Sequence, residues 1–146
     1  MIAADMKRGE RGWLYWWAVN PAASTTGEGL INLGASNTFT VNKRLYVMGQ
    51  FSRYLRPDDT RILAASSDSN LVAIGGKNGT GRASVVLINN GTSAITTTIS
   101  GLTLANVSGR RTSATEDLAK LTDIAVTGGA ITVTLPGKSV TSYVEY

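Results

Sequence analysis

From about residue 60 onward the sequence consists of short runs of β-branched and apolar residues, with a turn signal after each run. Val, Ile and Thr favour strands, whereas Gly, Asn, Asp, Ser and Pro favour the turns between them. Short strands separated by turns about every 8–12 residues are typical of an antiparallel sandwich. We therefore expect a mainly β chain that ends in an immunoglobulin-like β-sandwich of about eight strands. The expected strands are residues 60–66, 70–75, 82–89, 94–100, 105–115, 123–127, 130–135 and 139–146.

Two of the turn signals are specific enough to predict tight hairpins. Asn90-Gly91 and Gly128-Gly129 are dipeptides that adopt the left-handed backbone which two-residue hairpins require. Each is expected to join two neighbouring strands of one sheet.

The first 57 residues have a different character. Residues 12–19 (GWLYWWAV) carry apolar and aromatic side chains on both alternating faces, which is typical of a strand buried on both sides. Residues 20–41 are rich in Gly, Ser, Thr and Asn, and predict a long loop. Upstream, residues 2–8 are expected to form the last turns of a helix that ends at Gly9.

A second helix is expected over residues 43–55. Leu45, Met48 and Phe51 recur at helical spacing along this segment. Asn42 is a suitable N-cap, and Pro57 ends the helix because proline cannot continue the hydrogen-bond ladder.

The composition excludes several classes of function. The chain contains no histidine and no cysteine, so a Ser-His or Cys-His nucleophile cannot operate within it. Its net charge of +4 comes from scattered basic residues rather than from the dense cluster that nucleic-acid binding requires. The sequence holds no apolar run long enough to cross a membrane. We expect no metal, no cofactor, no nucleic acid and no membrane span.

Three segments resemble one enzyme family. Residues 13–21 (WLYWWAVNP) resemble the eighth barrel strand of family 30 glycoside hydrolases and their glucosylceramidase relatives. Residues 43–57 (KRLYVMGQFSRYLRP) resemble the eighth helix, and their Gly-Gln-Phe-Ser-Arg pattern is the most specific string. Residues 135–142 (LPGKSVTS) resemble the last strand of that family's side domain. The resemblance implies that residues 1–57 are the C-terminal remnant of a (β/α)8 barrel and residues 58–146 a β-sandwich domain.

The resemblance also implies where the catalytic residues are. Enzymes of this family are retaining hydrolases with one glutamate on the fourth barrel strand and one on the seventh, both ahead of any segment present here. Retaining chemistry needs two carboxylates about 5–5.5 Å apart. The chain is therefore expected to contain no catalytic residue and to be inactive alone. None of its ten acidic residues matches the family's catalytic motifs: Asp5, Glu10, Glu28, Asp58, Asp59, Asp68, Glu116, Asp117, Asp123 and Glu145.

Substrate contact is expected, by the same resemblance, at Trp16 and Asn20. A tryptophan at the position of Trp16 lines the innermost sugar subsite of the family, and Asn20 lies near the end of the same strand. The alternative is that the tryptophans of this segment only fill a core. Family members that recognise glucuronic acid carry an arginine shortly after the double tryptophan, whereas residues 18–23 read AVNPAA. This difference favours a neutral β-linked glycan such as galactan, glucan or xylan.

Three hypotheses of function remain open. The chain is a non-catalytic fragment or side domain of a secreted glycan hydrolase, a free-standing carbohydrate-binding module, or a structural protein that self-associates. The corresponding partners are a missing N-terminal barrel fragment, a polysaccharide, or a second copy of the chain. Residues 12–19 and 43–54 are expected to be buried against the sandwich or in an oligomer, because exposing so many aromatic side chains is costly.

Overall fold

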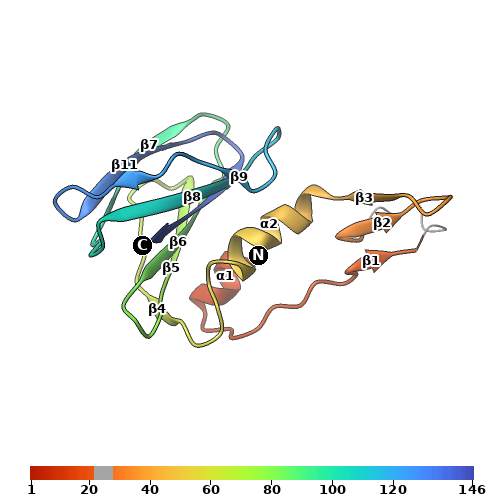
Figure 1. Cartoon of the computed structure of the whole chain (residues 1–146), viewed down its shortest axis with the longest axis horizontal. Helices are drawn as coiled ribbons and strands as arrows, with labels where there is room; N and C mark the ends of the chain where they lie inside the picture. The colour runs from red at the N-terminus through yellow and green to blue at the C-terminus, as the bar shows by residue number, and fades with distance from the viewer. Residues whose placement is uncertain (22–27) are drawn as a thin grey trace.

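The computed structural model describes residues 1–21 and 28–146. A β-sandwich forms one end of the molecule. At the other end a three-stranded sheet of β1, β2 and β3, called the small sheet below, extends away from the sandwich (Figure 1). The N-terminal part contains α1 (Ile2–Lys7), β1 (Val19–Asn20), β2 (Ile31–Leu33), β3 (Phe39–Val41) and α2 (Lys43–Ser52). The sandwich contains β4 (Thr60–Ile62), β5 (Leu71–Lys77), β6 (Ala83–Asn89), β7 (Ile95–Ser100), β8 (Asn106–Thr112), β9 (Ala119–Lys120), β10 (Ile124–Ala125), β11 (Ala130–Leu135) and β12 (Ser139–Glu145).

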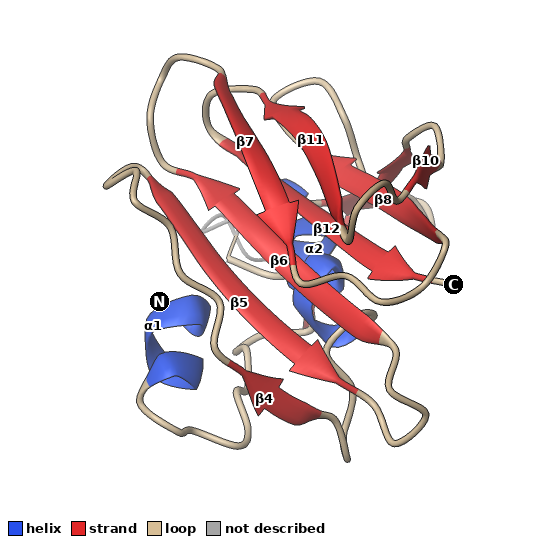
Figure 2. Cartoon of the chain, turned by 90° about the vertical axis from the view of Figure 1, so that its left-hand side faces the viewer, coloured by secondary structure: helices blue, strands red, loops and turns tan. Residues whose placement is uncertain are grey.

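The sandwich has two layers of unequal size. The larger sheet has seven strands in the order β10-β8-β12-β6-β5-β4, with β9 paired to β8, and its strands are antiparallel. Among the described residues, the smaller sheet consists of β11 and β7. Figure 2 shows that these two strands cover only part of the larger sheet and leave β4 and β5 uncovered by any strand.

Two apolar clusters stabilise this arrangement, one on each face of the larger sheet. The inner cluster joins the two layers through residues such as Leu87 and Val107 on one side and Val133 and Leu135 on the other. The outer cluster includes Phe51 of α2. Because both faces of the larger sheet are covered at its centre, the central strand β12 is buried at all seven positions.

The expected fold class is confirmed: the chain is mainly β, and an antiparallel sandwich follows a short strand and a helix. Each of the eight predicted windows contains a strand, and β9 was not expected. The tight turn expected at Gly128-Gly129 is present, because both glycines have positive φ and Thr127 pairs with Ala130 across them, but the strands that flank it, β10 and β11, belong to different sheets.

The hairpin predicted at Asn90-Gly91 is wrong. The strand before this turn, β6, belongs to the larger sheet of the sandwich, and the strand after it, β7, belongs to the two-stranded sheet. The turn therefore carries the chain from one layer to the other. Neither residue of the dipeptide adopts the left-handed backbone of a two-residue hairpin, and the apolar side chains of β7 pack over the large sheet, partly buried, rather than beside β6.

The strand predicted over residues 12–19 is also wrong in its extent. Only Val19 and Asn20 pair, in parallel, with β2. A strand buried on both faces needs a neighbouring strand on each side, and the described residues supply one short partner. The loop predicted over residues 20–41 is wrong in part, because β2 and β3 form an antiparallel pair within it.

The helices agree better with expectation. α1 ends where predicted, at Gly9, whose φ is +95°. α2 begins after Asn42 as predicted, but the Asn42 side chain donates to the Gly29 carbonyl at 2.7 Å instead of capping the helix. Regular helix ends at Ser52, three residues before the predicted end. Within the described residues, neither helix is both long and apolar enough to span a bilayer.

Candidate functional site

The aromatic segment leads irregularly into β1 and exposes Trp16. The Trp16 side chain is 81% exposed, and its ring meets that of Trp17 edge-on with centroids 5.7 Å apart. The peptide bond between these two residues is cis. Leu14 is also exposed, whereas Trp13 and Trp17 are half-buried. The residue expected to face substrate thus lies on the surface of the described structure.

Tyr15 and Arg44 hold this segment to the start of α2. The Tyr15 hydroxyl donates to the Glu28 carbonyl at 2.7 Å, and Arg44 Nη1 donates to that hydroxyl at 2.6 Å and to the same carbonyl at 2.8 Å. The Arg44 guanidinium also lies over the Tyr15 ring, 5.9 Å from its centroid. These contacts tie the exposed tryptophan to a helix that packs on the sandwich.

Asn20 lies in a different environment from Trp16. It is buried, with 1% of its side chain exposed, and Gly29 lies so close that a methyl group there would meet Asn20 Cβ at 2.6 Å. Neither polar atom of the Asn20 amide has a hydrogen-bond partner among the described residues. Trp17 Nε1 and Asn32 Oδ1 are buried without a partner in the same way. The described structure therefore does not bring Asn20 and Trp16 to one surface, but it leaves unsatisfied polar atoms on the paired residues Asn20 and Asn32 of β1 and β2 and on the nearby Trp17.

The junction between α2 and the sandwich is built around Gln50. This side chain is fully buried, and its Nε2 donates to Thr112 Oγ1 of β8 at 3.0 Å. On β12, Ser142 Oγ lies 2.6 Å from Gln50 Oε1 and 2.9 Å from the Gln50 carbonyl oxygen. A buried amide is costly unless its polar atoms are paired, so these contacts favour one depth and one rotation of the helix.

The neighbours of Gln50 complete the Gly-Gln-Phe pattern. A Cβ at Gly49 would lie 2.8 Å from Leu118 Cδ1, so the absence of a side chain lets the helix approach the loop after β8. Phe51 is buried in the outer apolar cluster. The sequence indicated that this string is distinctive, but it could not reveal that the partners of Gln50 lie 62 and 92 residues further along.

Charged groups reinforce the same junction at the N-terminus of α2. Lys43 pairs with the Asp117 carboxylate. The neighbouring Glu116 accepts two hydrogen bonds from Arg111, at 2.6 and 2.7 Å, and lies 2.7 Å from Ser113 Oγ. The Arg111 guanidinium holds the pKa of Glu116 below its ordinary value, because its two hydrogen bonds outweigh the effect of burial. Glu116 is therefore a structural anion rather than a candidate acid or base.

Glu145 is the acidic residue with the most unusual surroundings. Its carboxylate is fully buried and accepts hydrogen bonds from the backbone N–H groups of Ala83, Thr103 and Leu104. Burial alone would raise the pKa of Glu145, but the three donors outweigh burial and hold the pKa below its ordinary value. This carboxylate joins the start of β6 to the segment between β7 and β8. Across the described residues, no group of three or more acidic side chains is arranged to hold a metal ion.

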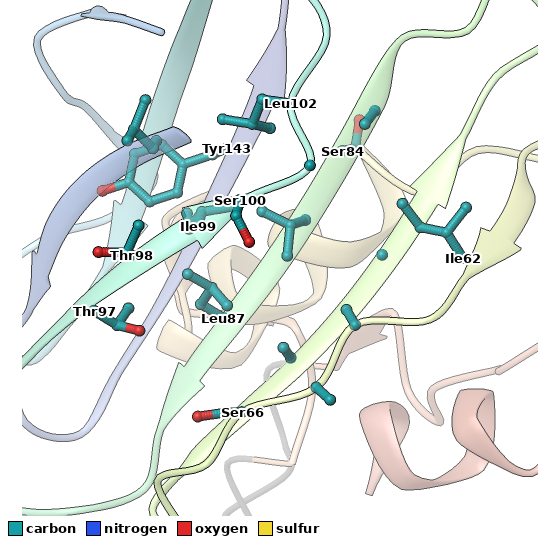
Figure 3. Close-up of a pocket in the computed structure, with 18 of the residues that line it drawn as sticks. Ile62, Ser66, Ser84, Leu87, Thr97, Thr98, Ile99, Ser100, Leu102 and Tyr143 are labelled. Atoms are coloured by element: carbon teal, nitrogen blue, oxygen red, sulfur yellow. The ribbon is translucent and has the colours of Figure 1, made fainter. Parts of the chain in front are cut away.

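A cavity of about 340 Å3 opens between the two layers of the sandwich. Its floor is the inner face of β5 and β6, including Leu71, Ala73 and Leu87. One wall is β7, from Thr97 to Ser100, and the opposite wall is the segment of residues 62–67 (Figure 3). Sequence reasoning did not anticipate this cavity, because it exists only where the smaller sheet fails to cover the larger one.

Similarity in sequence and structure to known proteins identifies the class of protein that has this geometry. No protein-family model matches the chain. It is 30% identical over 107 residues to the glucuronoxylanase XynC of Bacillus subtilis strain 168, a match that covers 72% of this chain and 25% of that protein.

Solved structures give a closer match to the whole chain. A family 30 endoxylanase from Clostridium papyrosolvens C71 superposes with a TM-score of 0.82 at 29% identity, covering 99% of this chain and 36% of that one. A family 30, subfamily 8 xylanase from Clostridium acetobutylicum gives 0.83 at 29% identity, covering 98% and 36%.

A β-sandwich preceded by a helix and a short strand is thus shared with polysaccharide-degrading enzymes. In sequence and fold, this chain corresponds to the C-terminal part of a family 30 glycoside hydrolase. It spans about a quarter of the length of the curated relative and about a third of the length of the solved ones.

Proposed function

We propose that this chain is the non-catalytic C-terminal flank of a secreted, retaining glycoside hydrolase, and that it binds and supports a barrel whose two catalytic glutamates lie outside it. The observation that carries this proposal is the exposed tryptophan and the unpaired polar atoms in and beside the small sheet. Trp16 is exposed, and Trp17, Asn20 and Asn32 have buried polar atoms without partners among the described residues. Buried polar groups are normally paired, so these atoms indicate a surface that further polypeptide completes.

The arrangement of α2 supports the same role. The helix is anchored to the sandwich by Gln50 and Phe51, while Arg44 at its other end holds the aromatic segment. The small sheet extends from this helix away from the sandwich (Figure 1). The β-rich half would therefore hold the small sheet in a fixed direction for the barrel.

Four of the ten acidic residues are engaged in structural contacts, which supports the proposal that they take no part in catalysis. Glu145 is taken up by three backbone donors, and Glu116 by Arg111 and Ser113. Asp117 pairs with Lys43, and Asp123 accepts from the Tyr146 hydroxyl at 2.8 Å. A retaining site needs two carboxylates that face a common sugar-sized space. These four are instead committed to structural contacts.

For the substrate we propose a neutral β-linked glycan, with xylan favoured over galactan and glucan because the relatives above are xylanases by name. The match to a glucuronoxylanase does not extend to a cation in residues 18–23, which read AVNPAA, so a glucuronate would lack its arginine partner. We assign sugar stacking to Trp16, whose exposed ring offers an aromatic face. For Asn20 we propose contact with the barrel first and with substrate second, since its two unused hydrogen-bonding atoms are buried in the described structure.

A chimera tests this proposal. The matched C-terminal segment of the Bacillus subtilis glucuronoxylanase is replaced by the whole of this chain, and release of reducing ends is measured on undecorated xylan and on glucuronoxylan. The chain alone is expected to release none, and the chimera is expected to be active on undecorated xylan. Trp16→Ala in the chimera is expected to lower kcat/KM at least about fivefold without lowering Tm, because stacking on a sugar contributes on the order of 1–3 kcal/mol.

Two results would contradict the proposal. One is hydrolysis by the isolated chain that disappears when one of its own acidic residues is changed to the amide. The other is an inactive chimera that is nevertheless folded and whose Trp16 remains as accessible to acrylamide as in the isolated chain. Binding of the isolated chain to a glycan array would favour a free-standing carbohydrate-binding module instead, and concentration-dependent oligomers without glycan binding would favour a structural protein.

A further inference from the structure

The side chains of the aromatic segment ahead of β1 alternate between two environments. Leu14 and Trp16 are 97% and 81% exposed, whereas Trp13, Tyr15 and Trp17 are half-buried. Successive side chains of an extended backbone point to opposite sides, so the half-buried side chains form one face of the segment and Trp16 projects from the other. The rings of Trp13 and Tyr15 support this arrangement, since their centroids lie 6.0 Å apart. A contact that fixes Tyr15 therefore also determines the direction in which Trp16 projects.

Backbone hydrogen bonds do not fix this part of the segment. The chain around β2 holds it only from Trp17 onward, through the carbonyl groups of Trp17 and Ala18. Within the described part of the chain, residues 11–16 make no backbone hydrogen bond. A ring on an unpaired backbone has many orientations and must lose that freedom when it binds a ligand. The orientation of Trp16 therefore depends on side-chain contacts.

The hydroxyl of Tyr15 supplies such a contact. It donates to the Glu28 carbonyl oxygen at 2.7 Å and accepts from Arg44 Nη1 at 2.6 Å, and the same nitrogen donates to the Glu28 carbonyl at 2.8 Å. No carboxylate of the described residues pairs with Arg44, so its charge is directed at these two oxygens. Hydrogen bonds from a charged donor are stronger than those between neutral groups. We call this three-way contact of Tyr15, Arg44 and Glu28 the clamp.

The helix that carries Arg44 is itself held firmly. The buried side chains of Gln50 and Phe51 attach α2 to the larger sheet of the sandwich. A support can orient a binding residue only when its own position is fixed by packing and hydrogen bonds. The clamp therefore connects the orientation of Trp16 to the sandwich through α2.

We propose that Tyr15 and Arg44 are positioning residues that hold the Trp16 ring in the orientation in which it stacks on a sugar. The stacking itself rests on the proposed function. Neither positioning residue contacts the sugar in this proposal, because Tyr15 lies on the opposite face of the segment and Arg44 Nη1 is bonded to two oxygens of the chain. A ring that is already oriented loses less conformational entropy on binding, so breaking the clamp weakens stacking without removing a contact to the substrate.

The first test uses the chimera described above and asks whether Tyr15 acts through Trp16. Tyr15→Phe keeps the ring and removes only the hydroxyl, and is expected to lower kcat/KM on undecorated xylan about threefold, as the loss of one hydrogen bond would. In a chimera that already carries Trp16→Ala, the same change is expected to have no further effect, because the ring that it orients is gone. Tyr46→Phe, which removes a hydroxyl from a half-buried tyrosine of α2, is the matched control and is expected to leave kcat/KM unchanged in both chimeras.

The second test uses the isolated chain and needs neither barrel nor substrate. The Trp16 and Trp17 rings have centroids 5.7 Å apart and an interplanar angle of 75°, so their electronic transitions couple and give a paired band in far-UV circular dichroism. Trp16→Phe removes this band and so identifies it. Arg44→Met changes no ring and is expected to lose the band, whereas Arg53→Met, at the exposed end of the same helix, is expected to retain it. Both arginine variants are expected to unfold at nearly the same urea concentration, because neither arginine belongs to an apolar cluster.

The proposal fails on either of two results. One is a paired band that Arg44→Met leaves unchanged. The other is an active chimera in which Tyr15→Phe lowers kcat/KM equally with Trp16 present and with Trp16 replaced, since the hydroxyl would then act on something other than this ring. An inactive chimera together with loss of the band in Arg44→Met would count against the proposed function alone, because the clamp would still be shown to orient the ring.

Discussion

Replacing Glu145 by glutamine tests how strongly the buried carboxylate stabilises the sandwich. The carboxylate accepts from the Ala83 N–H at 2.9 Å, from the Leu104 N–H at 3.0 Å and from the Thr103 N–H. Glutamine keeps one oxygen for Thr103 and Leu104 but turns an NH2 group toward the Ala83 donor. One charge-assisted bond is lost and a buried donor is left unpaired, so Glu145→Gln is expected to lower the free energy of unfolding by about 2–4 kcal/mol at pH 7.

The dependence of this loss on pH follows from the direction of the pKa shift. The pKa of Glu145 is lower in the folded chain than its ordinary value, which is about 4.3 in an unfolded peptide. Its contribution is therefore present above the unfolded pKa and disappears as pH falls through the folded pKa. The difference between wild type and Glu145→Gln is expected to be constant from about pH 6 to 8 and to shrink below about pH 4.

Urea unfolding followed by far-UV circular dichroism measures the effect at pH 7 and pH 3. Glu10→Gln is the matched control, because Glu10 is exposed and its amidation is expected to change stability by less than about 0.5 kcal/mol. The reasoning is refuted if Glu145→Gln is no less stable than Glu10→Gln at pH 7. It is also refuted if the loss at pH 3 equals the loss at pH 7, since the acid form would then make the same contacts as the carboxylate.

Three further outcomes are expected. Gln50→Leu should lower the free energy of unfolding by about 1–3 kcal/mol in urea titrations, because the buried amide pairs with hydroxyls of two strands and leucine pairs with neither; an unchanged midpoint would show that these bonds contribute nothing. Gly137→Ala should lower the free energy of unfolding by more than about 2 kcal/mol, since its Cβ would lie 2.1 Å from the Thr92 carbonyl oxygen. Gly79→Ala is the control and should be nearly neutral, because nothing lies within 4 Å of its Cβ. Equal midpoints of urea unfolding for the two variants would contradict this geometry. Trp16→Phe should remove most of the fluorescence that acrylamide quenches readily in the isolated chain, and a quenching curve like that of wild type would contradict the exposure of this ring.

The β-rich half could be predicted from the sequence because its signals are local. The alternation along β11, where Ile131, Val133 and Leu135 are buried and the residues between them are exposed, is visible in the letters themselves. Gly128-Gly129 likewise determines its own turn. The sequence does not show to which of the two sheets each strand belongs, because that depends on which other strands it pairs with. For that reason Asn90-Gly91 was predicted as a hairpin although it connects the two sheets.

The N-terminal part was predicted less well because its structure depends on neighbours. An apolar run such as residues 12–19 indicates burial, but whether it becomes a strand depends on strands beside it, and here only Val19 and Asn20 pair with β2. The candidate site shows the same limit. The sequence and the family resemblance singled out Trp16, which the structure exposes, but no local pattern indicated that the side chain of Asn20 would be buried beside Gly29.

The way α2 is seated has a practical consequence for exchanging parts between related enzymes. Gln50, Phe51 and Lys43 attach this helix to the β-rich half by buried amide, aromatic and ionic contacts, although it precedes that half in the chain. A crossover placed at Pro57 would separate the helix from the strands that hold it and would pair each half with a foreign surface. A crossover in residues 34–38, between β2 and β3, would keep the helix with the strands of the sandwich, but it would place the β2–β3 pairing and the contacts of Asn42 and Arg44 with the preceding segment across the new boundary.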